Sequence, residues 1–216
     1  MTQSGYDGLG RSESLAARGP PIMPARPPLI VGIGGTTRPG STSERLIRAV
    51  LGLAEVGGAR TRMFAGPDLV RLPHFTPDAT ERSADQTAMV EAVREADGVV
   101  IGTPGYHGGV SGLVKNAIDQ LEDLRDDPRP YLDGRPVGLI VTAGGWQACG
   151  VTLSSLRDVA HALRGWPTPA AVLVNSSDFV ANPLEDPLAP GPLRESIVLM
   201  TGQILSHVAA HAGGRP

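Results

Sequence analysis

Cysteine is nearly absent from this chain of 216 residues, which contains Cys149 alone. A single cysteine cannot form an internal disulfide or a cysteine-rich metal site, so the fold must depend on a hydrophobic core. The sequence also lacks an apolar run long enough to span a membrane, and its N-terminus lacks the apolar segment of a signal peptide. We therefore expect no metal, no membrane partner and a cytoplasmic location.

Excess charge of either sign is also absent, because the net charge is only -3 and the isoelectric point is about 5.9. Proteins that bind nucleic acids are usually basic, so we expect no nucleic-acid partner. Glycine and proline are plentiful, at 28 and 20 residues, and they follow no repeat. This composition indicates many defined turns within an ordinary α/β domain.

Residues 1–27 have no periodic apolar pattern and contain several prolines, including Pro20-Pro21 and Pro27-Pro28. Proline prevents a helix in such a segment, and the polar composition is typical of a disordered extension. We therefore predict a disordered tail over 1–27 and assign residues 28–212 to one folded domain.

Short apolar segments alternate with helical patterns along this domain, whereas residues 65–82 are predicted to form a loop. The predicted strands are 29–34, 61–64, 98–103, 136–142 and 170–175. The predicted helices are 44–57, 84–96, 111–124, 151–164 and 192–211. Five strands alternating with five helices predict a doubly wound parallel sheet with helices on both faces, in which glycine-rich loops meet at one carboxyl edge.

The first predicted strand leads into a loop rich in glycine and hydroxyl groups, 34–43, which opens a helix. Free N–H groups and the positive end of the helix dipole favour an anion at such a place. Arg38 supplies a guanidinium group, and Ser41 with Glu44 forms an S-x-x-E capping box that marks the helix start. The candidate phosphate-binding residues are Thr36, Arg38, Ser41, Thr42 and Ser43.

Two common nucleotide motifs do not fit this loop. A P-loop needs lysine where Ser41 stands, and a dinucleotide fingerprint needs a third glycine where Thr37 stands. The second predicted strand also ends in Met63-Phe64-Ala65, without an acid for a ribose hydroxyl. The remaining candidates are a terminal phosphomonoester, such as that of FMN, and a loop that only turns the chain.

Two further glycine-rich loops are expected beside the first. They supply the candidate cofactor-binding residues Pro104, Gly105, Tyr106, His107 and Gly108, and Ala143, Gly144 and Gly145. Glycine allows backbone to approach a flat ring, and the N–H groups of the third loop could hydrogen-bond a pyrimidine edge. A solvated His107 and a Trp146 that only packs on its neighbours are the plain alternatives. Lys115 is expected at the surface or an interface, and Asn116 could connect loops.

Two of these stretches resemble motifs of the NADPH-dependent FMN reductase family. Residues 35–43 are similar to its G-S-x-R-x-x-S-x-N loop, and residues 104–116 to its P-E-Y-N-x-S-x-P-G-x-L-K-N stretch. Gly105 replaces the glutamate of the second motif and His107 replaces the asparagine. The resemblance covers about residues 29–175. It implies a flavodoxin-like sheet of order 2-1-3-4-5, an FMN cofactor, electrons from NADPH or NADH, and a homodimer or homotetramer packed through the helix after the second motif.

The expected function is therefore an NAD(P)H-dependent FMN reductase, an enzyme that could supply reduced flavin to a monooxygenase. No side chain is expected to act as a catalytic acid or base, because the flavin carries the chemistry. One alternative is a reductase of quinones or azo compounds that keeps FMN bound. Another is a flavodoxin-type electron carrier, although such carriers are strongly acidic and this chain is only mildly so. A receiver-type signalling domain needs an aspartate where Thr103-Pro104 stands.

Overall fold

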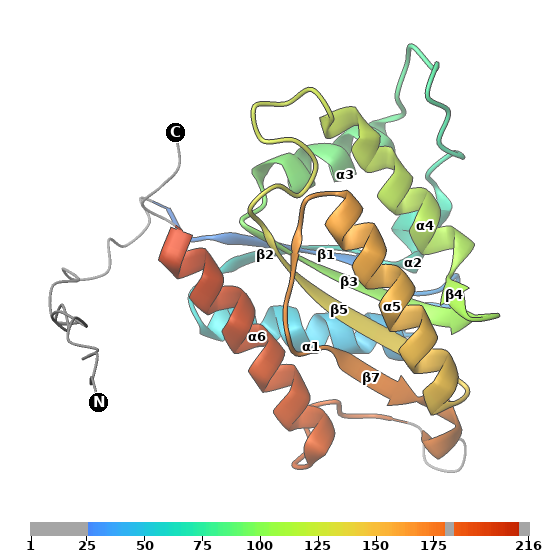
Figure 1. Cartoon of the computed structure of the whole chain (residues 1–216), viewed down its shortest axis with the longest axis vertical. Coiled ribbons are helices and arrows are strands. Elements are labelled where there is room, and N and C mark those ends of the chain that lie inside the picture. The colour runs from blue at the N-terminus through green and yellow to red at the C-terminus, as the bar shows by residue number, and fades with distance from the viewer. Residues whose placement is uncertain (1–25, 180–183, 212–216) are drawn as a thin grey trace, which may run out of the picture.

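A twisted, mostly parallel sheet forms the centre of the molecule, and helices cover both of its faces (Figure 1). This computed structural model describes residues 26–179 and 184–211. The predicted disordered tail falls on residues 1–27, of which 1–25 lie outside the described part. Arg26 lies inside it and forms an ion pair with Asp97 at 3.2 Å. No helix of the described ranges is long and apolar enough to cross a membrane.

The sheet has seven strands. They are β1 (Leu29–Gly34), β2 (Arg60–Phe64), β3 (Gly98–Tyr106), β4 (Gly109–Val110), β5 (Pro136–Ala143), β6 (Trp166–Pro167) and β7 (Val172–Asn175). The main order is β2-β1-β3-β5, β6 and β7 both pair with β5, and β4 pairs antiparallel with β3. The predicted fold class is confirmed, while the predicted five-strand order differs slightly. β4 and β6 have only two residues each, too few to show a periodic signal.

The helices follow the predicted pattern with three differences, one of which is that the helix predicted over 111–124 becomes a 3₁₀ turn after residue 119. They are α1 (Thr42–Val56), α2 (Gly66–Val70), α3 (Ala84–Glu95), α4 (Gly112–Asp119), α5 (Trp146–Ala162) and α6 (Pro192–His211), with 3₁₀ turns η2 (Gln120–Leu124) and η3 (Ser176–Phe179). The short α2 lies in the segment that was predicted as a loop. Its Pro67 is in the first turn, where a helix tolerates proline. α5 begins five residues before the predicted position, since Gly150 interrupts the apolar pattern without breaking the helix.

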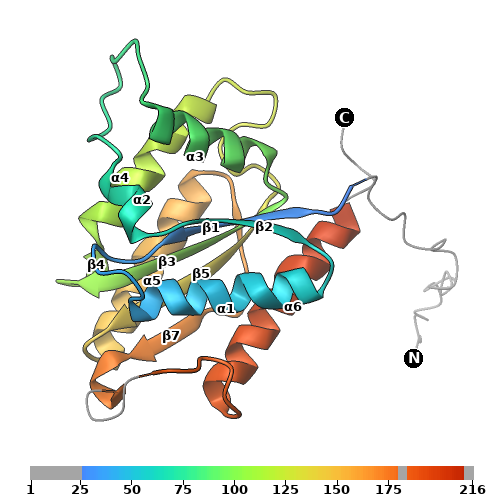
Figure 2. The ribbon, with the colours of Figure 1, turned by 180° about the vertical axis from the view of Figure 1, so that it is seen from behind.

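Hydrophobic residues form one core on each face of the sheet. α3, α4 and α5 pack against one face, and α1 and α6 pack against the other (Figure 2). Neighbouring residues of β1 alternate between them, with Val31 in the first core and Ile30 in the second. Burial on both faces explains why the central strands are continuous apolar runs.

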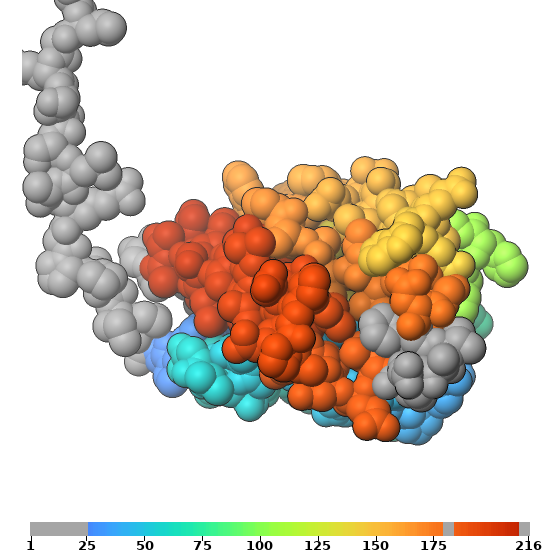
Figure 3. Space-filling model, turned by 90° about the horizontal axis from the view of Figure 1, so that it is seen from below, coloured from blue at the N-terminus to red at the C-terminus, as the bar shows by residue number. Residues whose placement is uncertain are grey.

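Strand register brings the loops of interest to one edge. Gly34 lies opposite Gly102, Pro104 opposite Thr142, and Ala143 opposite Asn175. β1, β3, β5 and β7 therefore all end at the side drawn on the right in Figure 1. Seen from below, the green tip between β3 and β4 projects at this edge beside the yellow start of α5 (Figure 3). Ligands of doubly wound sheets bind at this edge.

Candidate functional site

The loop after β1 ends at Ser41, which is the N-cap of α1. Its Oγ accepts a hydrogen bond from the N–H of Glu44 at 3.4 Å. The carboxylate of Glu44 accepts from the N–H of Gly40 at 3.0 Å, so the reciprocal bond of the predicted capping box is displaced by one residue. The hydroxyls of Ser41 and Ser43 lie 3.4 Å apart on buried residues. The predicted loop therefore does open a capped helix.

Hydrogen-bond donors remain available at this helix start. Among the described residues, none accepts a hydrogen bond from the N–H of Thr42 or Ser43. Arg38 is exposed, and no carboxylate of the described residues pairs with its guanidinium group. Free N–H groups at a helix N-terminus beside an unpaired arginine suit a phosphate group. The donor set at this loop therefore fits the phosphate end of FMN.

The hydroxyl of Thr36 has partners within the loop. Oγ1 donates to the carbonyl oxygen of Arg38 at 3.3 Å and accepts from the N–H of Arg38 at 3.2 Å. Thr36 thus shapes the turn that presents Arg38. The structure places all five predicted phosphate-binding residues on this one loop and helix start, while their contact with a ligand stays a prediction.

Packing fixes the two sides of the loop. A Cβ atom on Gly34 would lie 1.9 Å from the carbonyl oxygen of Gly102, and one on Gly66 would lie 1.6 Å from that of Thr36. Real Cβ atoms do not approach backbone oxygen so closely, so both positions require glycine. A Cβ atom on Gly40 would meet nothing within 4 Å, although its φ of +68° favours glycine. The loop is therefore clamped between β3 and α2 and is open in its middle.

The second glycine-rich stretch is a hairpin, and its prediction as a loop is wrong for residues 104–106. Pro104, Gly105 and Tyr106 continue β3, and only His107 and Gly108 form the turn, with φ values of 51° and 78°. Two consecutive residues with positive φ are typical of a two-residue hairpin turn. The sequence pattern did not predict this part of the strand, because proline and glycine are uncommon inside strands and usually indicate turns. Tyr106 and His107 are exposed at the tip.

Gly105 permits a close contact inside the protein. A Cβ atom there would lie 2.6 Å from Oγ1 of Thr152 on α5 and 3.1 Å from Cβ of Ala143. Thr152 is fully buried, and its Oγ1 has no hydrogen-bond partner in the described part of the chain. Thr103 holds the base of the hairpin, since its Oγ1 accepts from the N–H of Ser111 at 3.1 Å. Gly105 thus serves the packing of the hairpin on α5.

The third loop opens α5. Ala143 is the last residue of β5, Gly144 is exposed, and Gly145 is an N-cap without any side-chain hydrogen bond. A Cβ atom on Gly145 would meet nothing within 4 Å. Trp146, at the first position of α5, is 59% exposed. The open backbone of this loop leaves room for the edge of a flat ring, while its contact with a ligand stays a prediction.

Two features of this edge have no counterpart in the sequence prediction. Arg45 donates from Nε to the carbonyl oxygen of Gly40 at 2.9 Å and from a terminal nitrogen to that of Leu184 at 2.6 Å. A positive charge in the first helical turn is unfavourable with the helix dipole. This unusual position is the sequence signal that could have identified Arg45. Beyond β7, Asn175 donates from Nδ2 to Asp178 at 2.9 Å, which brings a fourth, polar turn to the edge.

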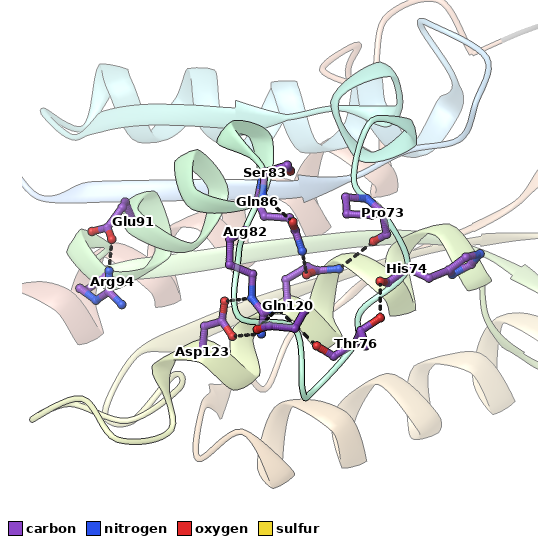
Figure 4. A network of polar contacts seen from close by, with 11 residues as sticks. Pro73, His74, Thr76, Arg82, Ser83, Gln86, Glu91, Arg94, Gln120 and Asp123 are labelled. Atoms are coloured by element: carbon purple, nitrogen blue, oxygen red, sulfur yellow. Dashed lines mark hydrogen bonds and ion pairs between the residues drawn. The ribbon is translucent and has the colours of Figure 1, made fainter.

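Asn116 does connect distant segments, as the sequence suggested. Its Nδ2 donates to the carbonyl oxygen of Pro73 at 3.0 Å, and its Oδ1 accepts from the N–H of Phe75 at 2.9 Å. Figure 4 shows Gln86 and Gln120 directed at each other beside this contact, with Gln120 bonded to the same oxygen of Pro73. Together these amides hold the segment before α3 on α4. Lys115 is exposed and pairs with Asp119.

Cys149 lies in the first turn of α5, close to the third loop, but it is fully buried. Its Sγ donates to the carbonyl oxygen of Val174 at 3.4 Å. Burial raises the pKa of the Cys149 thiol above its usual value, because the charged form loses hydration. The side chain therefore stays a neutral thiol near pH 7 and packs against β7.

Comparison with known proteins identifies a family for this chain. Residues 28–178 match the family model described as NADPH-dependent FMN reductase. An FMN-dependent NADPH-azoreductase of Staphylococcus aureus is 36% identical over 107 residues, which are 50% of this chain and 53% of that protein. The chain thus spans about half the length of the curated relatives that it matches.

Solved structures with the same fold include two oxidoreductases. One, from Corynebacterium diphtheriae, is 19% identical with a TM-score of 0.64, covering 86% of this chain and 99% of that one. The other, an NADH:FMN oxidoreductase in its apo form, is 21% identical with a TM-score of 0.62, covering 87% and 91%. At these identities the likeness concerns the fold alone. The family match over residues 28–178 goes further, and the chain belongs to the NADPH-dependent FMN reductase family.

Proposed function

We propose that this chain is an NAD(P)H-dependent FMN reductase. The observation that carries the proposal is the meeting of two helix starts at one sheet edge, of which the first has free N–H groups at Thr42 and Ser43 and the unpaired Arg38 beside it. The family match supports the same reading. When bound, FMN supplies the chemistry of the site by accepting hydride from a nicotinamide and passing electrons to an acceptor.

The protein's part in this reaction is binding and placement. Arg38 and the N–H groups of Thr42 and Ser43 would hold the phosphate. Backbone N–H groups of Gly144 and Gly145 would orient the pyrimidine edge, and the hairpin tip would border the ring. No described side chain at this edge is needed as an acid or base, because hydride transfer requires distance and orientation between two rings.

A second candidate is a reductase of azo compounds or quinones that keeps FMN bound. The azoreductase of Staphylococcus aureus, 36% identical over half of this chain, favours it specifically. Steady-state rates of NADPH oxidation with free FMN, a quinone and an azo dye as acceptors separate the two functions. A reductase of free flavin is saturated by FMN, whereas a tightly bound cofactor makes the rate independent of added FMN.

A homodimer or homotetramer is part of the proposal. A cavity of about 540 Å³ lies between α4, η2, α5 and the segment before α3. Its lining includes the apolar side chains of Ile118, Val159 and Leu163. It also includes Arg82 and Asp123, which form a bidentate ion pair. An apolar floor with a charged rim is typical of interfaces. Light scattering of the purified chain measures the oligomeric state. We also propose a cytoplasmic location, because a chain with a single cysteine does not depend on disulfides.

The absorption spectrum of the purified chain tests the function most directly. We expect FMN to co-purify or to bind when added at micromolar concentration, and we expect NADPH or NADH to bleach the flavin spectrum. Comparing both nucleotides at equal concentration gives the preference between them. A chain that binds no FMN at micromolar concentration would overturn the proposal.

A further inference from the structure

Glu44 and Arg48 form an ion pair in the first two turns of α1, beside the loop that ends at Ser41. Glu44 is 6% exposed. One of its carboxylate oxygens, Oε2, accepts the N–H of Gly40 at 3.0 Å. The other, Oε1, accepts from Nε of Arg48 at 2.9 Å and pairs with a terminal nitrogen of Arg48 at 2.8 Å. The loop therefore already contains one bound carboxylate of its own.

This carboxylate competes electrostatically with an external anion. It occupies the N–H of Gly40, whereas the N–H groups of Thr42 and Ser43 are among those that have no acceptor in the described chain. A negative charge in a first helical turn also satisfies part of the positive helix end. A phosphate dianion bound at the same turn would be repelled by it, since little water lies around a buried carboxylate to screen the repulsion.

Arg48 limits this repulsion. Its side chain is 57% exposed, while that of Glu44 is 8% exposed, so the guanidinium group covers the carboxylate from the solvent side. The two charges cancel at a distance, and Arg38 remains the exposed cation of the loop. Arg45 is held by two carbonyl oxygens and keeps its full charge nearby. The charge felt by a phosphate thus depends on how well Arg48 neutralises Glu44.

We propose that the Glu44–Arg48 pair sets the affinity of this loop for the phosphate group of FMN: Glu44 lowers the affinity and Arg48 restores part of it. The pair acts on the phosphate alone, so the affinity for riboflavin, which has no phosphate, should be insensitive to it. It keeps the affinity for FMN low enough for exchange, as a reductase of free flavin needs. The inference rests on the proposed function and assigns Glu44 and Arg48 as positioning residues of the phosphate site.

Two substitutions with opposite signs test the pair. Glu44→Gln keeps an oxygen that can accept the N–H of Gly40 but removes the charge, so the Kd for FMN should fall about threefold to tenfold. Arg48→Gln exposes the charge of Glu44, so the Kd for FMN should rise by a similar factor. Titration of flavin fluorescence gives both values, with riboflavin as the matched ligand whose Kd should stay within twofold.

Two further variants are controls. Glu44→Gln combined with Arg48→Gln should return the Kd for FMN to near that of the native chain, because both charges are gone. Arg194→Gln, at an exposed position on α6, changes the net charge by the same amount as Arg48→Gln but should leave the Kd for FMN unchanged. Thermal unfolding of each variant without ligand separates a loss of folding from a loss of binding. An unchanged or weaker FMN affinity in folded Glu44→Gln would overturn the inference.

Inorganic phosphate alone separates this inference from the proposed function. The shift in Tm produced by phosphate should be larger in Glu44→Gln than in the native chain and smaller in Arg48→Gln. If the Tm shifts caused by phosphate follow this order across the three chains but the native chain binds no FMN, the proposed function fails and the charge pair stands. If FMN binds and neither substitution changes its Kd, the proposed function stands and the charge pair fails.

Discussion

Two glycine-rich stretches at the same sheet edge use their glycines for opposite purposes. In the loop after β1, the middle is open and exposed, and a Cβ atom on Gly40 would touch nothing within 4 Å. In the β3–β4 hairpin, a Cβ atom on Gly105 would lie 2.6 Å from Oγ1 of the buried Thr152. The loop leaves donors free for a ligand, whereas the hairpin brings its backbone against its own helix.

This difference separates binding from stability. Arg38 has no carboxylate partner among the described residues, so its loss removes little from the folded state. The hairpin has close internal contacts, so its disturbance acts on the fold before it acts on a ligand. Substitutions in the two stretches should therefore change different measured quantities.

The largest expected effect is on stability and comes from Gly105→Ala. The new Cβ atom would meet Thr152 and Ala143 within 3.1 Å, and overpacking of this kind typically costs about 2 kcal/mol of the free energy of unfolding. Urea unfolding measures this loss. Gly112→Ala is the matched control, since its Cβ atom meets nothing within 4 Å at the first position of α4, and it should be neutral or slightly stabilising.

A second substitution shows whether Thr152 is the cause of that loss. Thr152→Ala removes the nearest atom, so the double variant Gly105→Ala/Thr152→Ala should lose less than the sum of the two single losses. Strict additivity would mean that the hairpin does not lie against Thr152.

The next largest effect is on binding and comes from Arg38→Ala. A guanidinium hydrogen bond to a phosphate is charge-assisted, so its removal should raise the Kd for FMN about tenfold. The Kd for riboflavin should hardly change, and neither should the urea midpoint. Equal losses for both flavins would remove Arg38 from the phosphate site, and a lower urea midpoint would contradict the separation of binding from stability.

The alternation of apolar strands with amphipathic helices made the fold predictable. Ile30 and Val31 belong to opposite cores, and such two-sided burial leaves a continuous apolar run in the sequence. β4 and β6 were not predictable, because a two-residue strand exists only through its partner strand. The hairpin escaped for a related reason: Pro104 and Gly105 read as turn residues, and only their register with β5 and β4 makes them a strand.

Those parts of the candidate site that are formed by neighbouring residues in the sequence could be predicted. Ser41 and the following helix could be predicted from spacing alone, because a cap and its helix are neighbours in sequence. The contact of Arg45 with Leu184 was not, since 139 residues separate them. Nor could spacing reveal that Glu44 holds the N–H of Gly40 instead of that of Ser41, because this choice depends on the turn at Gly40.

A smaller effect should follow from Ser111→Ala, at the end of the hairpin. Oγ of Ser111 accepts from the N–H of Val114 at 3.3 Å and caps α4. Losing such a cap costs about 1 kcal/mol of the free energy of unfolding. The Kd for FMN should stay within twofold, because the backbone N–H of Ser111 still bonds to Thr103 and keeps the hairpin closed. A large loss of FMN affinity without a loss of stability would place this end of the hairpin in the binding site.

The smallest expected effect has the opposite sign and comes from His107→Gly at the hairpin tip. His107 has a φ of 51°, in the left-handed region that residues other than glycine adopt at a cost, so glycine relieves that strain. Glycine also gives the unfolded chain more freedom, and the two terms leave a net stabilisation of about 0.5 kcal/mol at most. Urea unfolding and the Kd for FMN are measured together. Unchanged FMN affinity would mean that the hairpin contributes backbone alone, and a clear loss would assign the imidazole of His107 to the flavin, giving this hairpin a binding role beside its packing role.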